Sequence, residues 1–231
     1  MDELSPKALT AVKAAVNKRL VAAPINPEVA NDLGYELFFH INKGNVKLCL
    51  EVIALGANLM VEADMTLDGY SGTSLAFACW KELPIVAVAI IECPDVDINL
   101  KEPVKGQTPL MMAIMKRLGP VVAALLRKGA DINATDSEDK TALVLACETS
   151  YPEAALALIN ARANVHIGNL LEIPAVDTPP MKEVKDAIIH ALGAPTGAHA
   201  KPPLRETAGG RRRKTRRRKH RKNRKHSHKK N

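Results

Sequence analysis

Three segments of the sequence repeat one pattern: Thr73-Ser74-Leu75-Ala76-Phe77-Ala78, Thr108-Pro109-Leu110-Met111-Met112-Ala113 and Thr141-Ala142-Leu143-Val144-Leu145-Ala146. The threonines are 35 and 33 residues apart. In each segment the threonine can cap a short helix, and the leucine and the last alanine then fall on one face of it. This spacing predicts a series of similar helical units.

A second motif follows each threonine after about twenty-one residues. Its copies are Asp95-Val96-Asp97-Ile98-Asn99, Gly129-Ala130-Asp131-Ile132-Asn133 and Arg162-Ala163-Asn164-Val165-His166, with an earlier copy at Gly56-Ala57-Asn58-Leu59. Counting back from Gly56 places a degenerate first unit at Tyr35–His40. The stretches between the motifs begin near Pro84, Pro120 and Pro152 and are apolar nearly all round. Each predicts a second helix that neighbouring units must cover on both sides.

These motifs resemble the ankyrin repeat family, which has a period near 33, a Thr-Pro-Leu-His-x-Ala start and a Gly-Ala-Asp end. The resemblance covers about residues 31–167 and implies an all-α solenoid of about four repeats. No repeat keeps the family histidine, because Phe38, Ala76, Met111 and Val144 stand at its position. Asp95 and Arg162 replace the terminating glycine, which we expect to cost about 1 kcal/mol each where the backbone is left-handed.

The flanks predict one further helix on each side of the repeats. Ser5-Pro6 can start a helix that runs to Val21, and residues 181–192 form an amphipathic stripe that ends at Gly193. Both are expected to cap the stack, because terminal units of a solenoid must shield its core. The predicted organisation is an N-terminal capping helix at 1–30, repeats at 31–168, a C-terminal capping helix at 169–193, and a disordered linker and basic tail at 194–231.

The charge of the 231-residue chain is divided unevenly. The formal net charge is +8, yet fourteen Lys and Arg residues and no acid lie after residue 210. Residues 1–210 then hold 19 basic and 25 acidic residues, a formal charge of −6. The tail fits a nuclear import signal, a contact to RNA or DNA phosphates, or an inert solubilising end. Its candidate binding residues are Arg211, Arg212, Arg213, Lys214, Arg216, Arg217, Arg218, Lys219, Arg221 and Lys222.

The ankyrin resemblance also implies where a protein partner binds, namely at the exposed ends of the first helices and at the loop tips. The candidates at helix ends are Asn42, Lys43, Trp80, Lys81, Met115, Lys116, Glu148 and Thr149. Those at loop tips are Tyr70, Lys105, Gln107 and Lys140. Trp80 is either an exposed anchor or packed against a neighbouring turn. The strip formed by Lys43, Lys81 and Lys116 either selects an acidic partner or only keeps the surface soluble.

Motifs for catalysis, metals and cofactors are not found in the sequence. It holds no phosphate-binding glycine loop, no H-E-x-x-H and no G-x-S-x-G. The four cysteines form no C-x-x-C pair and are expected to be buried, reduced thiols. His40 is expected to pack in the core. We therefore expect no catalytic residue, no metal and no cofactor.

The sequence leads to three hypotheses for function. The first is a non-enzymatic adaptor that binds another protein, with a tail that contacts an import receptor, RNA or DNA. The second is a nucleic-acid-associated accessory protein in which the tail is the main binding element. The third is an enzyme on a helical scaffold. We expect a monomer in the nucleus or cytoplasm, not secreted and without membrane contact, since no signal peptide or spanning segment is apparent. The tail composition is similar to that of ankyrin proteins of large DNA viruses, which would place the protein in a host cell.

Overall fold

The computed structural model describes residues 4–21, 25–65, 70–168 and 170–193. The basic tail, with all ten of its candidate residues, lies outside the described residues. The elements are α1 (Pro6–Val21), α2 (Pro27–Asn42), α3 (Val46–Ala54), β1 (Glu62–Met65), β2 (Tyr70–Thr73), α4 (Ser74–Trp80), α5 (Pro84–Glu92), α6 (Pro109–Met115), α7 (Gly119–Lys128), α8 (Ala142–Glu148), α9 (Pro152–Asn160), the 3-10 turns η2 (Leu170–Glu172), η3 (Pro174–Asp177) and η4 (Pro179–Met181), and α10 (Lys182–Gly193).

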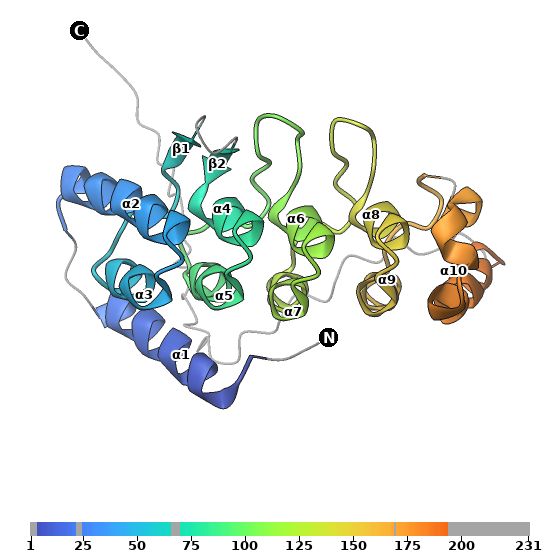
Figure 1. Cartoon of the computed structure of the whole chain (residues 1–231), viewed down its shortest axis with the longest axis horizontal. Helices are drawn as coiled ribbons and strands as arrows, with labels where there is room; N and C mark the ends of the chain where they lie inside the picture. Colours follow the sequence, from blue (N-terminus) through green and yellow to red (C-terminus); the bar gives the residue numbers. More distant parts are fainter. Residues whose placement is uncertain (1–3, 22–24, 66–69, 169, 194–231) are drawn as a thin grey trace, which may run out of the picture. The chain divides into compact units, whose positions relative to one another are not determined.

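Paired helices stacked side by side make up most of the fold (Figure 1). The first helices α2, α4, α6 and α8 pack on one another in chain order. Each also packs on the second helix of its own unit, and the second helices α3, α5 and α7 pack in a row beneath them. The mostly helical, repetitive fold expected from the sequence is confirmed.

Threonines begin three of the first helices. The hydroxyl oxygens of Thr73, Thr108 and Thr141 accept hydrogen bonds from the backbone N–H of Ala76, Met111 and Val144, at 3.5, 3.3 and 3.3 Å respectively. All three threonines are buried. They occupy equivalent places in successive units, as their spacing predicts.

The family histidine is replaced in one unit by a weaker acceptor. The backbone N–H of Thr108 lies 3.5 Å from the sulfur of Met111, which stands at the histidine position. A thioether sulfur accepts hydrogen bonds only weakly. A weak hydrogen bond is therefore present at this position although the histidine is absent.

A hydrogen-bond ladder joins the loops that follow the second helices. The side chain of Asn99 accepts a bond from the backbone N–H of Asp131 at 2.8 Å, and Asn133 does the same for Asn164 at 2.8 Å. One unit earlier the acceptor is the sulfur of Met60, 3.3 Å from the N–H of Asp97. The repeated Asp-Ile-Asn motif thus connects each unit to the next.

One short hairpin departs from the all-α expectation. Strands β1 and β2 pair antiparallel, with Glu62 opposite Thr73 and Met65 opposite Tyr70. The pairing lies within the long first loop of the repeats, and β2 ends at Thr73, which caps α4. It adds to the helical stack without replacing any helix.

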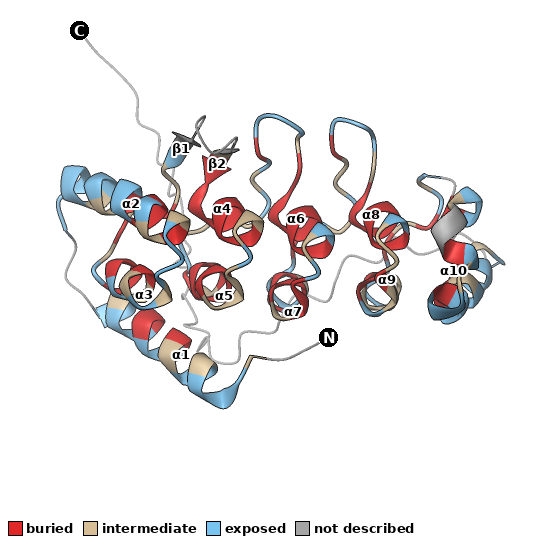
Figure 2. Cartoon of the chain, viewed as in Figure 1, coloured by how far each residue is buried: buried red, intermediate tan, exposed pale blue. Residues whose placement is uncertain are grey.

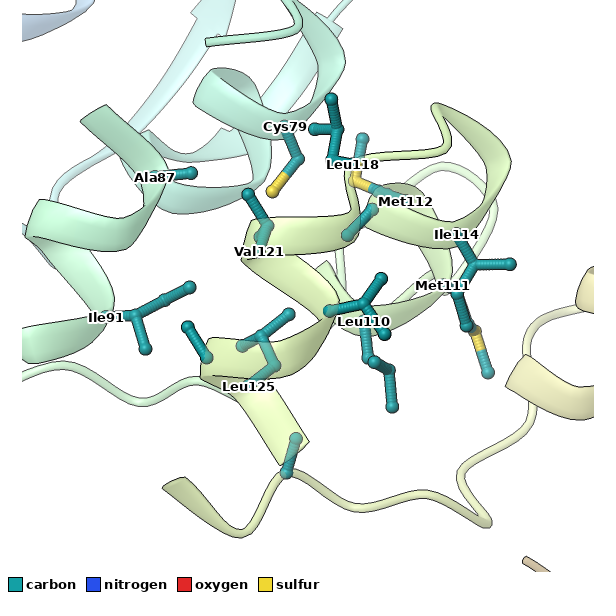
Figure 3. Close-up of a cluster of buried hydrophobic side chains, with 14 of the residues drawn as sticks. Cys79, Ala87, Ile91, Leu110, Met111, Met112, Ile114, Leu118, Val121 and Leu125 are labelled. Carbon is teal, nitrogen blue, oxygen red and sulfur yellow. The ribbon is translucent and has the colours of Figure 1, made fainter. Parts of the chain in front are cut away.

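The core runs continuously through the stacked units (Figure 2). Between α5 and the α6–α7 pair, Ile91 and Ala87 face Val121, Leu125 and their neighbours (Figure 3). Leucine, isoleucine, valine and alanine dominate this interior. Phe38 and Phe77 are the aromatic rings buried to 2 % exposure or less among the described residues.

Helix α1 has the bounds that the sequence predicts but not the expected position. It packs on α3 and α5, along the second helices, instead of closing the end of the stack (Figure 1). Val12 and Val16 are buried there, whereas Leu9 and Leu20 stay 41 % and 59 % exposed. Hydrogen bonds from the Arg19 guanidinium hold α1 at this position, and no spacing in the sequence reveals these contacts.

Arg19 ties α1 to two successive units. Its guanidinium donates hydrogen bonds to the carbonyls of Ile53 and Ala57, at 3.2 and 2.8 Å, and to the carboxylate of Asp95. Ile53 lies in the last turn of α3 and Ala57 in the turn that follows the helix, so Arg19 binds at the C-terminal end of α3. A cation at this end also interacts favourably with the helix dipole.

Helix α10 packs on α9 and on the 3-10 turns that precede it. Val184 and Ile188 are fully buried in this contact, and Leu192 is half-buried. The stripe that the sequence shows on this helix therefore faces the last repeat.

Candidate protein-binding surface

The C-terminal ends of the first helices place the candidate side chains at equivalent positions. Asn42, Trp80, Met115 and Glu148 end α2, α4, α6 and α8, and the next residues are Lys43, Lys81, Lys116 and Thr149. All eight are half-buried or exposed. The turn that follows uses a left-handed residue in every unit: Gly44, Glu82, Arg117 and Ser150, with φ of +67°, +59°, +53° and +50°. The repeated turn gives the side chains of successive units the same orientation.

Trp80 is packed on one side and open on the other. Its ring stacks on Phe77, with centroids 5.9 Å apart and an interplanar angle of 17°. Phe77 in turn contacts Phe38 of the preceding unit at 5.5 Å. Trp80 remains half-buried, so both interpretations of this residue hold in part. Its orientation is set by the core beneath it.

The three lysines of the strip have different neighbours. The ammonium of Lys81 lies 4.8 Å from the Trp80 ring centroid and 5.5 Å from that of Phe77. Lys43 lies 5.7 Å from the Phe39 ring centroid. Lys116 forms an ion pair with Glu82 at 3.1 Å. Among the residues that the structure describes, no carboxylate forms a salt bridge with Lys43 or Lys81, whose charges lie over aromatic rings.

In the last unit of the surface one lysine is paired with two carboxylates. Lys140 lies 3.1 Å from Glu138 and 3.0 Å from Glu148, and these bonds, that to Glu148 foremost, raise the pKa of the Lys140 ammonium. The Thr149 hydroxyl donates to the carbonyl of Leu145 at 2.8 Å. The attraction for an acidic partner is therefore concentrated around Lys43 and Lys81.

The loop-tip candidates separate into exposed and covered residues. Lys105 is exposed, and the neighbouring Val104 is 71 % exposed, which the sequence interpretation missed. Gln107 corrects the expectation of a loop tip, because it precedes the Thr108 cap and is only 9 % exposed. Tyr70 is the first residue of β2, and its side chain lies outside the described part of the chain.

Two buried carboxylates support the loops. Glu102 accepts hydrogen bonds from the backbone N–H of Val104, Lys105 and Gln107. Asp136, 34 residues later, accepts bonds from those of Glu138 and Lys140, each at 2.9 Å. Glu102 and Asp136 are separated by about one repeat period, and this spacing could have identified them from the sequence.

The cysteines in the described part of the chain are buried thiols. Burial raises the pKa of Cys49, Cys79 and Cys147 to about 12 and that of Cys93 to about 11. Such thiols hold their protons at neutral pH and are poor nucleophiles. His40 is half-buried and lies 3.4 Å from Glu36 on the same helix. Among the described residues, no group of three or more His, Cys, Asp or Glu could hold a metal ion.

A groove of about 750 Å³ lies between α1 and the second helices α5 and α7. Its lining combines apolar residues with Lys13, Glu92 and Arg127. Burial disfavours the charged form of Glu92, but hydrogen bonds and charge from Lys128 and Arg127 outweigh it and lower the Glu92 pKa. The groove explains why Leu9 of α1 is only partly covered.

A comparison with protein families agrees with this geometry. Residues 75–169 match the model of ankyrin repeats (3 copies). The matched ankyrin repeats run from α4 through α9, while the α2–α3 unit precedes the match. Ankyrin repeats are in general non-enzymatic modules that bind other proteins.

A curated protein is similar to part of this chain. The chain is 30 % identical over 135 residues to a Danio rerio protein described as "Putative palmitoyltransferase ZDHHC13". The match covers 58 % of this chain and 20 % of the relative, so the chain spans about a fifth of that protein's length. The comparisons give no support to a viral origin. In the part of the chain that the structure describes, no helix has the length and apolar character needed to cross a membrane.

Proposed function

We propose that this protein is a non-enzymatic adaptor that binds another protein through its ankyrin repeats. The contact surface comprises the ends of the first helices and the adjoining loop tips. The observation that carries the proposal is the repeated placement of Trp80, Lys81, Met115 and Lys116 on consecutive units. An aromatic ring held by its own core neighbours loses little conformational entropy on binding and is favoured as an interface anchor.

The charges on this surface favour an acidic segment of the partner. Lys43 and Lys81 contact rings instead of carboxylates, and Lys105 is exposed at the loop tip. An extended acidic segment with one apolar side chain would match this arrangement, with the apolar group against Trp80. Electrostatic complementarity of this kind raises association rates and selects among partners.

The test uses the full chain as bait in a quantitative affinity experiment and then compares variants. Replacing Trp80→Ala together with Lys81→Ala is expected to abolish capture of the main partner. The matched control is Lys185→Ala on α10, which should leave capture unchanged. Equal loss in both variants, or no loss in the first, would contradict the proposed surface. Thermal melting of each variant verifies that it is folded.

For the basic tail we propose nuclear targeting or contact with nucleic acid. Fourteen cationic side chains in 21 residues support either role, and the tail offers no aromatic ring on which a base could stack. Deleting residues 211–231 separates the adaptor from the alternative, an accessory protein bound mainly through its tail. Partner capture that survives deletion and nuclease treatment supports the adaptor. Loss of all binding supports the alternative.

The salt dependence distinguishes the two tail roles. Binding through about six phosphates gives a slope of about −5 in a plot of log affinity against log salt for duplex DNA. Nuclear import without affinity for RNA or DNA would assign the tail to an import receptor. A fluorescent-protein fusion of the full chain, with and without residues 211–231, measures the import.

A further inference from the structure

The first helix of the stack exposes positions that every later unit buries. Phe39 of α2 is 56 % exposed, while its equivalents Phe77, Met112 and Leu145 are at most 6 % exposed. Tyr35 is 55 % exposed, while the equivalent threonines are at most 5 % exposed. Figure 2 shows the same contrast between α2 and the largely buried α4, α6 and α8.

The covering group in the later units is the first helix of the preceding unit. Phe77 contacts the ring of Phe38 on α2 at 5.5 Å, so a residue in the Phe39 register points toward the unit before it. The face of α2 that carries Tyr35 and Phe39 therefore continues the repeat-to-repeat interface beyond the first unit. The elements that pack extensively on α2 are α3 and α4, and α1 lies instead along α3 and α5.

The chemistry of this face indicates its partner. Glu28, Asp32 and Glu36 are spaced four residues apart and all are exposed, so they form an acidic row beside the two aromatic rings. Lys43 lies over the Phe39 ring, and His40 lies near Glu36, at the C-terminal end of the row. A terminal unit whose outer face contacts only water is expected to carry polar residues on that face. Two exposed aromatic rings do not fit this expectation and indicate a binding partner.

A second copy of this chain fits the face poorly. If two copies met through this face, the acidic row of one would lie against that of the other and repel it. The opposite end of the stack is covered by α10 and is not open to the face. We propose that the α2 face, defined as Val29, Tyr35 and Phe39 with Glu28, Asp32 and Glu36, binds a basic amphipathic helix of a partner protein. The helix lies along α2 as α2 lies along α4, with its apolar stripe on the rings and Lys or Arg beside the carboxylates. This site is centred on Tyr35 and Phe39 and does not depend on the proposed surface at Trp80, although Lys43, which lies over the Phe39 ring, borders both.

The experiment measures binding of a defined probe to the full chain. The probe is a fluorescein-labelled synthetic peptide of 18 residues, with leucines at helical spacing and lysines flanking the stripe. Fluorescence anisotropy gives its Kd for the wild type and variants. We expect Tyr35→Ala with Phe39→Ala to weaken binding at least about tenfold, as for residues at the centre of an interface. We expect Glu28→Lys with Asp32→Lys to weaken it several-fold, and high salt to reduce the difference.

Matched controls identify the site. Ile189→Ala removes an exposed apolar side chain from α10, and Trp80→Ala changes the other proposed surface; both should bind the probe as the wild type does. A probe with glutamate in place of lysine should bind far more weakly. Thermal melting shows that each variant is folded.

Four results would overturn the proposal. They are no binding by the wild type, equal binding by the Tyr35/Phe39 variant, equal binding of the acidic probe, and loss of binding confined to Trp80→Ala. Sedimentation of the wild type adds a further criterion. A dimer that dissociates in the Tyr35/Phe39 variant would show that a second copy covers the face. Failure here leaves partner capture through Trp80 unaffected, so the two proposals are separately tested.

Discussion

Arg162 takes a backbone conformation that suits glycine. Its φ is +67°, close to the +83° of Gly129 at the equivalent place one unit earlier. Asp95, which the sequence places in the same role, is not among the residues with positive φ. There α5 ends at Glu92, the next residue Cys93 is extended, and Asp95 accepts a hydrogen bond from Arg19. The expected cost of replacing glycine therefore applies to Arg162 and not to Asp95.

This difference predicts opposite effects for two similar substitutions. Arg162→Gly should raise the free energy of unfolding by about 0.5–1 kcal/mol, because glycine meets no steric penalty at positive φ. Asp95→Gly should lower it, because the change removes the contact to Arg19 and adds chain entropy to the unfolded state. Equilibrium denaturation of both variants checks the prediction. Two shifts of the same sign would contradict it.

The buried thiols predict how stability depends on pH. Their pKa values of about 11 to 12 in the folded protein exceed the value near 8.5 of an unfolded chain. Above about pH 8.5 the unfolded state loses protons that the folded state keeps. The free energy of unfolding should therefore fall as the pH rises, by up to about 1.4 kcal/mol per pH unit for each thiol.

Denaturation curves at pH 7.5, 8.5 and 9.5 measure this slope. Cys79→Ala should reduce the slope by removing one thiol, whatever its effect on stability at pH 7.5. A thiol reagent at pH 8 should react slowly with the folded protein and quickly in denaturant. Constant stability between pH 7.5 and 9.5 would contradict burial of the cysteines.

Single helices of the repeats owe their stability to residues that the stack covers. Leu110 and Leu143 occupy equivalent places in α6 and α8 and are 1 % and 0 % exposed. Replacing either with alanine should lower the free energy of unfolding by about 2–5 kcal/mol. Lys116→Ala, directly after α6, is the control, since a surface ion pair contributes about 1 kcal/mol or less. Near-normal melting of both leucine variants would contradict the register of the repeats.

The sequence pattern of α1 predicts where the helix begins and ends but not where it packs. Its start at Ser5-Pro6 and its end at Val21 follow from local capping and from the breaking residues beyond, so both are predictable. Its apolar stripe predicts that one side is covered but not by which element. The contacts of Arg19 with Ile53, Ala57 and Asp95 join residues 34 to 76 positions apart, and such pairs have no signature in the sequence.

Across the whole stack, the asparagine ladder couples neighbouring units. Asn133→Ala removes the side chain that accepts the N–H of Asn164, and we expect unfolding to become easier by about 0.5–1.5 kcal/mol and less cooperative. His166→Ala is the matched control, because His166 stands at the same motif position in the last repeat. It should change stability by no more than a few tenths of a kcal/mol. Chemical denaturation followed by circular dichroism compares the two variants. Equal effects would show that the ladder does not couple the repeats.

The repeat period, the capping threonines, the apolar second helices and the register of the candidate surface could all be predicted from the sequence. Each depends on interactions between residues close in the chain, which recur with every unit. The tertiary structure alone decided the place of α1, the burial of Gln107 and the exposure of Phe39. These depend on which unit lies beside a residue, and the first unit has none before it. Identical positions in the repeat therefore become core in the middle of the stack and surface at its end.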